Sequence, residues 1–302
     1  MDVPKRRLGR TEQQVSIIGM GGFHIGHPNT PDDEAISLIH AAIDRGITFM
    51  DNSWDYNSGL SEVRMGRALS VEGYRDRVFL MTKLDGRTKA AYDQQLAQSL
   101  ARLLTDRIDL VQFHEVIRPD DADRIFAPGG AIEAAVAARD AGKIRFIGFT
   151  GHKSPAYHLH TIETARKNGF TFDTVQMPVN IFDAHYESFA ERVIPVAADL
   201  DMGILAMKTF GDHNLLDAGV ADPIDMLHYS LDRPVSAVIT GIDKPAILEQ
   251  AIRAATSFAP LSEEKRKAIL AASARVARDG KLERYKTSHF FDSTVQNPHW
   301  LG

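Results

Sequence analysis

The chain has 302 residues, of which 44% are hydrophobic and 25% are charged, and its formal net charge is -5, so it can bury a large core as one large domain or two smaller ones. The absence of cysteine excludes disulfides, thiolate metal sites and a cysteine nucleophile. Scattered basic residues argue against nucleic acid as a partner, and the lack of a long apolar run or signal peptide predicts a cytoplasmic protein without a membrane partner.

Strands and helices alternate along the chain. The N-terminal segment predicts two short strands around a turn, at 7–12 and 14–19, and the second leads into the glycine-rich segment 19–23. Apolar periodicity and terminal signals predict helices at 32–45, 60–69, 89–104, 130–141, 154–167, 185–198, 223–230 and 244–257. Strands are predicted at 48–51, 78–83, 108–114, 144–150, 172–177, 203–207 and 237–240. An extra helix at 262–278 precedes an aromatic tail, which we expect to pack over the rest of the protein.

The spacing of the strand ends predicts the fold class. Seven strands end about thirty residues apart, and with the strand before Gly19 they make eight units, as in a (β/α)8 TIM barrel of the α/β class. Those seven ends are Asp51, Lys83, His114, Thr150, Met177, Met207 and Thr240. A closed barrel brings all of its strand ends to one rim, so Asp51, Lys83 and His114 become neighbours. No linker or repeat marks a second domain, and residues 1–302 are expected to form one.

Tyr56, five residues after Asp51, completes a reactive group. A tyrosine has an ordinary pKa of ~10, and we expect the ammonium of Lys83 to lower it by favouring the phenolate. Asp51 would hold Lys83 charged and oriented, while His114 donates a hydrogen bond to a substrate oxygen. These residues suit proton exchange at a carbonyl or alcohol oxygen. No metal site is expected, because His158 and His160 diverge on a helix.

The arrangement of Asp51, Tyr56, Lys83 and His114 resembles the catalytic tetrad of the aldo-keto reductase family. Supporting stretches are 46–51, Ser61-Glu62, 66–69, 106–110 and the glycine-lysine-isoleucine-arginine stretch within 141–150. The resemblance covers nearly the whole chain and implies an NAD(P)-dependent enzyme that reduces small-molecule carbonyls to alcohols or catalyses the reverse oxidation. In that mechanism hydride passes to the carbonyl carbon and Tyr56 exchanges the oxygen proton.

The resemblance also implies where a cofactor lies, extended across the barrel rim. Gly21, Gly22 and Phe23 are expected near its ribose and the substrate mouth. The serine-asparagine pair that usually contacts the nicotinamide carboxamide is replaced by Thr150-Gly151, so His152 or nearby backbone is expected to supply a contact. Other expected cofactor contacts are Asp51, Gln176, Met207 in place of a stacking aromatic, Lys208 at a pyrophosphate oxygen, Thr209 and Phe210.

The final strand-helix unit matches the adenosine-binding segment of the family. Its cofactor-binding residues are expected to be Gly241, Ile242, Asp243, Lys244 and Gln250. Lys244 suits a 2′-phosphate, whereas Asp243 would repel one or accept a hydrogen bond from a free ribose hydroxyl. Family habit favours NADP, and these residues leave NAD open.

Aromatic residues suggest the kind of substrate. Phe23, His24, Trp54, His114 and Phe290 are expected to line a pocket, with Phe210, His289 and Phe291 as further candidates. Such walls favour an aromatic or sugar-like carbonyl over a highly charged one. Two alternatives remain open here: a cofactor-binding, redox-sensing subunit of a larger assembly, and a barrel lyase or metal hydrolase that shares only the architecture. No oligomeric state is predicted.

Overall fold

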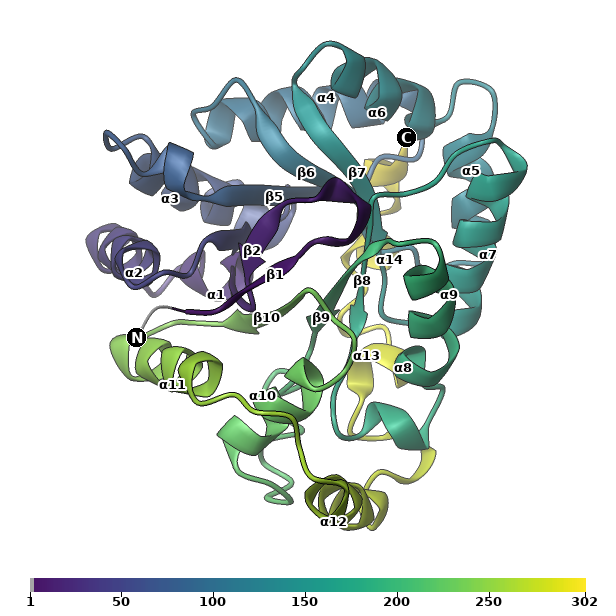
Figure 1. Ribbon diagram of the computed structural model, residues 1–302. Helices are drawn as coiled ribbons and strands as arrows, with labels where there is room; N and C mark the ends of the chain where they lie inside the picture. The colour runs from purple at the N-terminus through teal and green to yellow at the C-terminus, as the bar shows by residue number, and fades with distance from the viewer. Residues whose placement is uncertain (1–2) are drawn as a thin grey trace.

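A closed barrel of eight parallel strands forms the centre of the protein (Figure 1). The computed structural model describes residues 3–302, so the first two residues of the expected domain lie outside the described part. The barrel strands are β3 (Ile18–Gly21), β4 (Phe49–Asp51), β5 (Phe79–Leu84), β6 (Ile108–Phe113), β7 (Ile144–Thr150), β8 (Thr174–Pro178), β9 (Gly203–Met207) and β10 (Ala237–Gly241). β10 pairs with β3 and closes the barrel. The predicted TIM-barrel class is confirmed.

Alternation of side chains along each strand decides which residues reach the barrel mouth. Phe49, Met81 and Leu110 lie in one buried cluster inside the barrel, whereas Met50 and Leu80 belong to the larger cluster between strands and helices. Residues two positions further along a strand point to the same side. Asp51, Lys83, Gln112 and then His114 therefore follow the inward residues toward one end of the barrel, where they are buried.

A small antiparallel hairpin covers the other end of the barrel. It consists of β1 (Lys5–Arg7) and β2 (Gln14–Ser16), and Leu8 and Val15 insert into the interior cluster. Figure 1 shows it in front of the barrel strands. The predicted strand boundaries 7–12 and 14–19 are wrong, because residues 9–11 form a 3-10 turn and the second strand breaks at Ile17. At that break the Ser16 hydroxyl donates to the Ile18 carbonyl and accepts from Thr48 and Phe49.

Helices surround the barrel. They are α1 (Gly22–Ile25), α2 (Asp32–Asp44), α3 (Leu60–Leu69), α4 (Lys89–Arg102), α5 (Asp121–Phe126), α6 (Ala131–Asp140), α7 (Pro155–Lys167), α8 (Phe189–Arg192), α9 (Ile194–Asp199), α10 (Pro223–Leu231) and α11 (Pro245–Thr256). The predicted helix 185–198 is interrupted: a 3-10 turn, Asp183–His185, precedes α8 and α9, and Pro195 stands in the first turn of α9. Proline lacks the amide hydrogen that a continuous helix requires. None of the described helices is long and apolar enough to cross a membrane.

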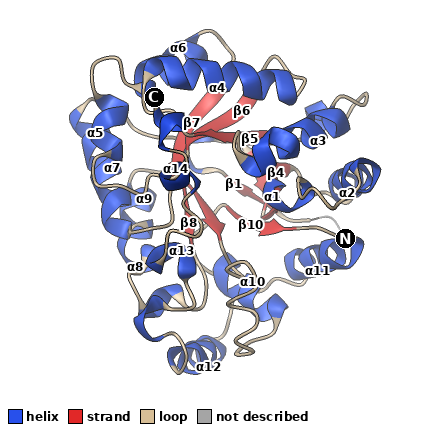
Figure 2. Cartoon of the chain, turned by 180° about the vertical axis from the view of Figure 1, so that it is seen from behind, coloured by secondary structure: helices blue, strands red, loops and turns tan. Residues whose placement is uncertain are grey.

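The C-terminal segment returns across the barrel mouth. Helix α12 (Glu263–Ala274) ends four residues before the predicted boundary, and α13 (Arg284–Thr287) and α14 (Ser293–Gln296) follow. In the view from behind, α13 and α14 lie over the strand ends, on the side away from the hairpin (Figure 2). Leu301 is buried, and its carbonyl accepts hydrogen bonds from the Arg87 and Thr88 amides. The prediction that the tail packs over the protein is confirmed.

Arg87 ties together the loops after β5 and β6 at this mouth. It is fully buried, and its Nε donates to Asp121 at 2.9 Å. Its Nη1 donates to the Asp85 carbonyl, and its Nη2 donates to the carbonyls of His114 and Glu115. One guanidinium therefore fixes the loops after β5 and β6 against the start of α5.

We expect Arg87→Leu to lower the free energy of unfolding by about 3–5 kcal/mol, because it removes the buried cation that donates a hydrogen bond to the buried Asp121 carboxylate and leaves it only Arg118 at 3.7 Å. Urea unfolding provides the measurement. Arg67→Leu is the matched control: Arg67 pairs with Asp32 on the surface, where an ion pair contributes at most about 1 kcal/mol. Equal losses in the two variants would contradict the assigned role of Arg87.

Candidate active site

Asp51, Lys83 and Tyr56 form a continuous polar chain at the barrel mouth. The Lys83 ammonium donates to Asp51 and, at 2.8 Å, to the Asn52 carbonyl. Its Nζ also lies 3.4 Å from the Tyr56 hydroxyl. The second Asp51 carboxylate oxygen accepts a hydrogen bond of 2.9 Å from Gln176. The structure thus brings together three of the four residues predicted as catalytic.

Tyr56 lies at the start of a tight turn. The next two residues, Asn57 and Ser58, have left-handed backbone angles, and the side-chain amide of Asn57 donates to the Phe23 carbonyl. Burial raises the pKa of Tyr56 well above its ordinary value, and the charges of nearby acids, including Asp51 and Asp55, raise it further. The expected net lowering of this pKa by Lys83 is wrong, because burial and the acids outweigh the opposing effect of one ammonium. Tyr56 is therefore a neutral phenol near pH 7.

His114 lies beside Tyr56 and within a group of acids. Its ring centroid is 5.8 Å from that of the tyrosine. Its Nδ1 lies 3.0 Å from Asp85 Oδ1 and 3.4 Å from Asp55 Oδ1. Burial lowers the pKa of His114, but the charges of Asp55, Asp85 and Glu115 outweigh that effect and raise it above its ordinary value.

The same environment perturbs Asp85. Burial raises its pKa to about 6, and the charge of Asp55 adds to this increase, whereas His114 opposes it. The His114 imidazole and the Asp85 carboxyl group, whose pKa values are both raised, thus lie in contact next to the phenol of Tyr56. Neither Asp55 nor Asp85 was predicted as a site residue, because each follows a strand end in a loop and its role depends on contacts that spacing does not specify.

Two unpartnered polar atoms lie where a nicotinamide carboxamide is expected. Thr150 Oγ1 and Gln176 Oε1 are buried and have no hydrogen-bond partner among the described residues. Thr150 and Gln176 are register partners on β7 and β8. A carboxamide carries a donor and an acceptor that match such atoms. These residues therefore fit a nicotinamide group.

The other two residues of the predicted carboxamide contact lie differently. A Cβ on Gly151 would stand 2.3 Å from the Val116 carbonyl oxygen, which explains why no asparagine side chain is present there. His152 is buried, and its Nε2 lies 2.9 Å from Asp292 Oδ1 in the C-terminal tail. The His152 side chain therefore binds the tail, and its predicted contact with the carboxamide would have to replace that bond.

The predicted pyrophosphate segment follows β9. Lys208 has a left-handed backbone, and its ammonium lies 4.6 Å from the centre of the Phe291 ring without an ion-pair partner among the described residues. Burial lowers the pKa of Lys208. A bound anion would offset this effect by favouring the charged ammonium. Met207 and Phe210 are partly buried, whereas Thr209 is fully buried, with its hydroxyl 3.4 Å from that of Ser230.

The predicted adenosine segment lies at the junction of β10 and α11. Asp243 and Lys244 are exposed, Gln250 is half-buried, and Lys244 precedes the first turn of α11. Ile242 is fully buried in the core, so its side chain does not reach a ligand and only its backbone is available. The His24 ring covers Gly241, where a Cβ would approach it within 2.4 Å. Gly21 and Gly22 lie next to this segment, at the end of β3 and the start of α1.

The predicted pocket residues divide into two groups. Phe23 is 48% exposed, and its ring stands edge-on to both Tyr56, at 5.4 Å, and His24, at 5.7 Å. Trp54 instead donates its indole N–H to Gln98 of α4 and packs against Trp300. Phe290 is exposed and contacts Phe291 and Arg284. Among the described residues of this set, Phe23 and His114 therefore stand edge-on to the Tyr56 ring, whereas His24 contacts Phe23.

The tail supplies a further set of contacts that the sequence did not predict. Glu115 accepts hydrogen bonds from the backbone and hydroxyl groups of Ser293 and Thr294. The Ser293 hydroxyl lies 2.7 Å from both Glu115 Oε1 and Asp55 Oδ2, and it donates its single proton to one of these carboxylates at a time. Asp292 binds His152, Lys153 and His289. These residues lie almost 180 positions or more from Asp55 and Glu115, so local patterns carry no signal for them.

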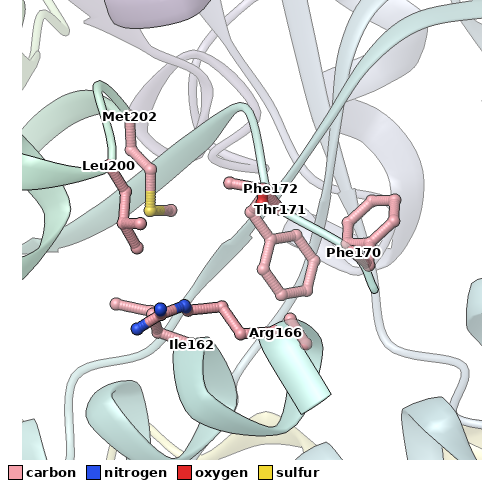
Figure 3. A pocket seen from close by; sticks show the side chains of 8 residues that line it. Ile162, Arg166, Phe170, Thr171, Phe172, Leu200 and Met202 are labelled. Atoms are coloured by element: carbon pink, nitrogen blue, oxygen red, sulfur yellow. The ribbon is translucent and has the colours of Figure 1, made fainter. Parts of the chain in front are cut away.

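A separate hollow lies at the opposite end of the barrel (Figure 3). It is lined mainly by apolar side chains from the end of α7 and from the segments that enter β8 and β9. They are Ile162, Ala165, Arg166, Phe170, Thr171, Phe172, Leu200 and Met202. Since these residues precede the starts of β8 and β9, the hollow has no part in the site at the strand ends.

A parallel barrel with polar side chains converging at its C-terminal rim is the architecture of TIM-barrel enzymes. Comparison with known proteins identifies the family: a model of the aldo/keto reductase family matches residues 17–228. The chain belongs to this family of NAD(P)-dependent oxidoreductases, and the sequence-based recognition is confirmed.

Individual relatives agree with this assignment. Aldo-keto reductase YhdN of Bacillus subtilis is 33% identical over 205 residues, which cover 64% of this chain but only 57% of YhdN. An aldo-keto reductase of Bacillus halodurans in its holo form has a TM-score of 0.74 at 22% identity, with 92% of this chain and 99% of that one covered. An aldo-keto reductase of Klebsiella pneumoniae in complex with NADPH has a TM-score of 0.72 at 21% identity, covering 91% and 96%.

Asp292→Ala should loosen the tail, because it removes the carboxylate that binds the Lys153 ammonium and the imidazoles of His152 and His289. Burial acts to raise the pKa of Asp292, but bonds from His152, Lys153 and His289 outweigh it and lower that pKa to about 2. The attachment is then fully present above the ordinary carboxyl pKa and is lost as the pH falls from about 4 to about 2.

Hydrogen exchange of residues 289–302 at neutral pH measures this effect. We expect faster exchange in the variant and a loss of about 1–3 kcal/mol in local stability. Asp140→Ala, at an exposed helix end, is the control and should leave tail protection unchanged. Unchanged protection in Asp292→Ala would show that Asp292 does not hold the tail.

Proposed function

We propose that this protein is an NAD(P)H-dependent reductase that converts an aldehyde or ketone to an alcohol, or catalyses the reverse oxidation. The observation that supports it most strongly is the buried chain from Asp51 through Lys83 to the Tyr56 hydroxyl, with His114 beside the phenol. These side chains lie at the barrel rim, where TIM-barrel enzymes have their active sites.

Tyr56 acts as the general acid in reduction. Its raised pKa keeps the phenol protonated at neutral pH, so a proton is available for the substrate oxygen. Lys83 stabilises the phenolate that remains, since its ammonium lies 3.4 Å from the phenol oxygen. Asp51 holds Lys83 in this position, and His114 orients the carbonyl. In alcohol oxidation the same residues accept the proton.

A nicotinamide cofactor supplies the hydride when bound. Thr150 and Gln176 are proposed to hold its carboxamide, because both carry a buried atom without a partner. Lys208 is proposed to bind the pyrophosphate, and residues 241–244 with Gln250 the adenosine. His152 is proposed to keep its hydrogen bond to Asp292 in the tail rather than bind the cofactor. The Klebsiella relative, solved with NADPH, has the same barrel.

We further propose that NADPH is preferred over NADH. Lys244 is exposed immediately before the first turn of α11, where the helix amides also favour an anion. A 2′-phosphate placed there meets one cation and the positive end of a twelve-residue helix. Asp243 is exposed and opposes this preference, so we expect a moderate selectivity.

The substrate is proposed to be an uncharged carbonyl compound with an aromatic or sugar-like body. Three acids, Asp55, Asp85 and Glu115, lie close to His114 and would repel a carboxylate or phosphate at the reacting end. Phe23 is exposed beside Tyr56 and offers a flat surface for a ring.

Tyr56→Phe tests the proposed acid. We expect kcat for carbonyl reduction to fall by about 10²–10⁴-fold, because the proton donor is lost. Cofactor oxidation in a carbonyl screen measures the rate, and quenching of tryptophan fluorescence measures NADPH binding, which should not change. Tyr157→Phe on α7 is the matched control. If Tyr56→Phe retains full activity, the proposed role of Tyr56 is wrong.

Lys244→Glu tests the nucleotide preference. The dissociation constant for NADPH should rise roughly tenfold, since reversing a surface charge removes one attraction and adds one repulsion, each of up to about 1 kcal/mol. Binding of NADH should change little. Lys143→Glu makes the same charge change at the opposite end of the barrel. An equal effect on NADPH and NADH would contradict a 2′-phosphate contact.

A further inference from the structure

The loop after β5 places a carboxylate behind His114 that the proposed proton relay does not include. Asp85 follows Lys83 by two positions and is completely buried. Its own amide and that of Gly86 donate to Gln95 Oε1, at 2.9 and 2.8 Å. Its carbonyl accepts from Arg87. Because the backbone is fixed on both sides, the Asp85 carboxylate has little freedom to move away from the imidazole.

The contacts of His114 define which ring nitrogen carries a proton. Nδ1 lies 3.0 Å from Asp85 Oδ1, 3.3 Å from Ser53 Oγ and 3.4 Å from Asp55 Oδ1. The Ser53 hydroxyl is already engaged, since it donates to Asp55 at 2.5 Å. An ionised carboxylate only accepts hydrogen bonds. Nδ1 must therefore be the donor, and Asp85 is its nearest acceptor.

No other cation among the described residues accounts for Asp85. Arg87 is adjacent, but its guanidinium hydrogen bonds go to Asp121 and to three backbone carbonyls. The remaining carboxylate oxygen, Asp85 Oδ2, is buried without a partner. A buried carboxylate is costly unless it is paired. Among the residues that the structure describes, Asp85 pairs only with His114.

The opposite nitrogen is left for the substrate. No described residue hydrogen-bonds His114 Nε2, and the imidazole ring lies edge-on to Tyr56. Building on the function proposed above, we propose that Asp85 is a positioning residue: it accepts the Nδ1–H hydrogen bond of His114 and favours the imidazolium, so that Nε2–H donates to the substrate carbonyl oxygen while Tyr56 transfers its proton. Asp55 is the second acceptor at Nδ1.

The charged and titratable groups that face His114 come from several elements. Asp55 and Tyr56 follow β4, Asp85 follows β5, and Glu115 follows β6. Arg87 donates to the His114 carbonyl. In the tail, the Ser293 hydroxyl lies between Asp55 and Glu115. Replacing Asp85 by asparagine removes one negative charge and keeps a possible acceptor for Nδ1–H. The imidazolium then loses its closest stabilising charge.

The first measurement needs no variant. Nitrogen and proton NMR of the wild-type protein, in buffer with a chelator, should show a protonated His114 Nδ1 at every pH and a pKa above the ordinary histidine value. In Asp85→Asn we expect this pKa to fall by about 1–2 units, the size of shift that one adjacent opposite charge produces. A wild-type His114 with an unprotonated Nδ1, or an unchanged pKa in Asp85→Asn, would overturn the proposal.

Kinetics provide a second readout. In Asp85→Asn the alkaline limb of the pH profile for carbonyl reduction should move to lower pH, and kcat at neutral pH should fall about tenfold while NADPH binding stays the same. Asp123→Asn is the matched control, because Asp123 faces His160 at 3.2 Å on the exposed surface. If wild-type enzyme reduces carbonyls and Asp85→Asn keeps the same profile and kcat, Asp85 has no positioning role.

The two proposals fail in different ways. If the wild-type protein neither binds a nicotinamide cofactor nor reduces any carbonyl tested, the proposed reductase function fails, whatever His114 shows by NMR. If it does both, and the Asp85→Asn protein unfolds cooperatively like the wild type, the His114 titration and the pH profile decide the role of Asp85 alone.

Discussion

Side chains of a β-strand point alternately to its two faces, and in a closed parallel barrel one of these faces is entirely internal. Phe49, Met81 and Leu110 fill the interior. Asp51, Lys83 and His114 lie two or four positions further along, point to the same side and reach the barrel mouth. The geometry of the candidate site is therefore a consequence of strand register. A shift of one residue in any strand would turn a reactive group outward into the helix layer.

Burial then determines the chemistry of these groups. Lys83 is almost completely buried, and its charge is balanced by Asp51 and by the Asn52 carbonyl. Arg87 is balanced in a similar way by Asp121 and three carbonyls. Each cation thus joins strand-end loops that the barrel alone would leave independent. The site combines a rigid frame with an excess of acids, and burial, together with these acids, raises the pKa of Tyr56 and keeps its phenol protonated.

Much of the fold was predictable, because a buried parallel strand and an amphipathic helix each leave a clear pattern. The strand exits at Asp51, Lys83 and His114 follow from that pattern. The hairpin boundaries do not, since the break at Ile17 depends on Ser16 binding a neighbouring strand. The interrupted helix around Pro195 was predictable from proline chemistry, yet the apolar periodicity obscured it.

The candidate site was predictable where a residue ends a strand and obscure where it lies in a loop. Asp55, Asp85 and Glu115 stand in loops, and their importance depends on packing against residues far along the chain. The pKa of Tyr56 was misjudged for the same reason: sequence spacing revealed the single nearby ammonium and did not reveal the surrounding carboxylates. Asp292, which reaches back to His152 across 140 positions, belongs to the same category.

The connection between Ser293 and Asp55 spans 238 positions, and the Thr294–Glu115 bonds span 179. A ribosome makes about 5–20 residues per second, so the eight barrel strands are complete seconds before the tail emerges. During that interval Glu115 lacks the hydroxyl groups of Ser293 and Thr294, and Asp55 has only that of Ser53. The contacts of Ser293 and Thr294 with Asp55 and Glu115 can therefore form only after the barrel strands have been synthesised.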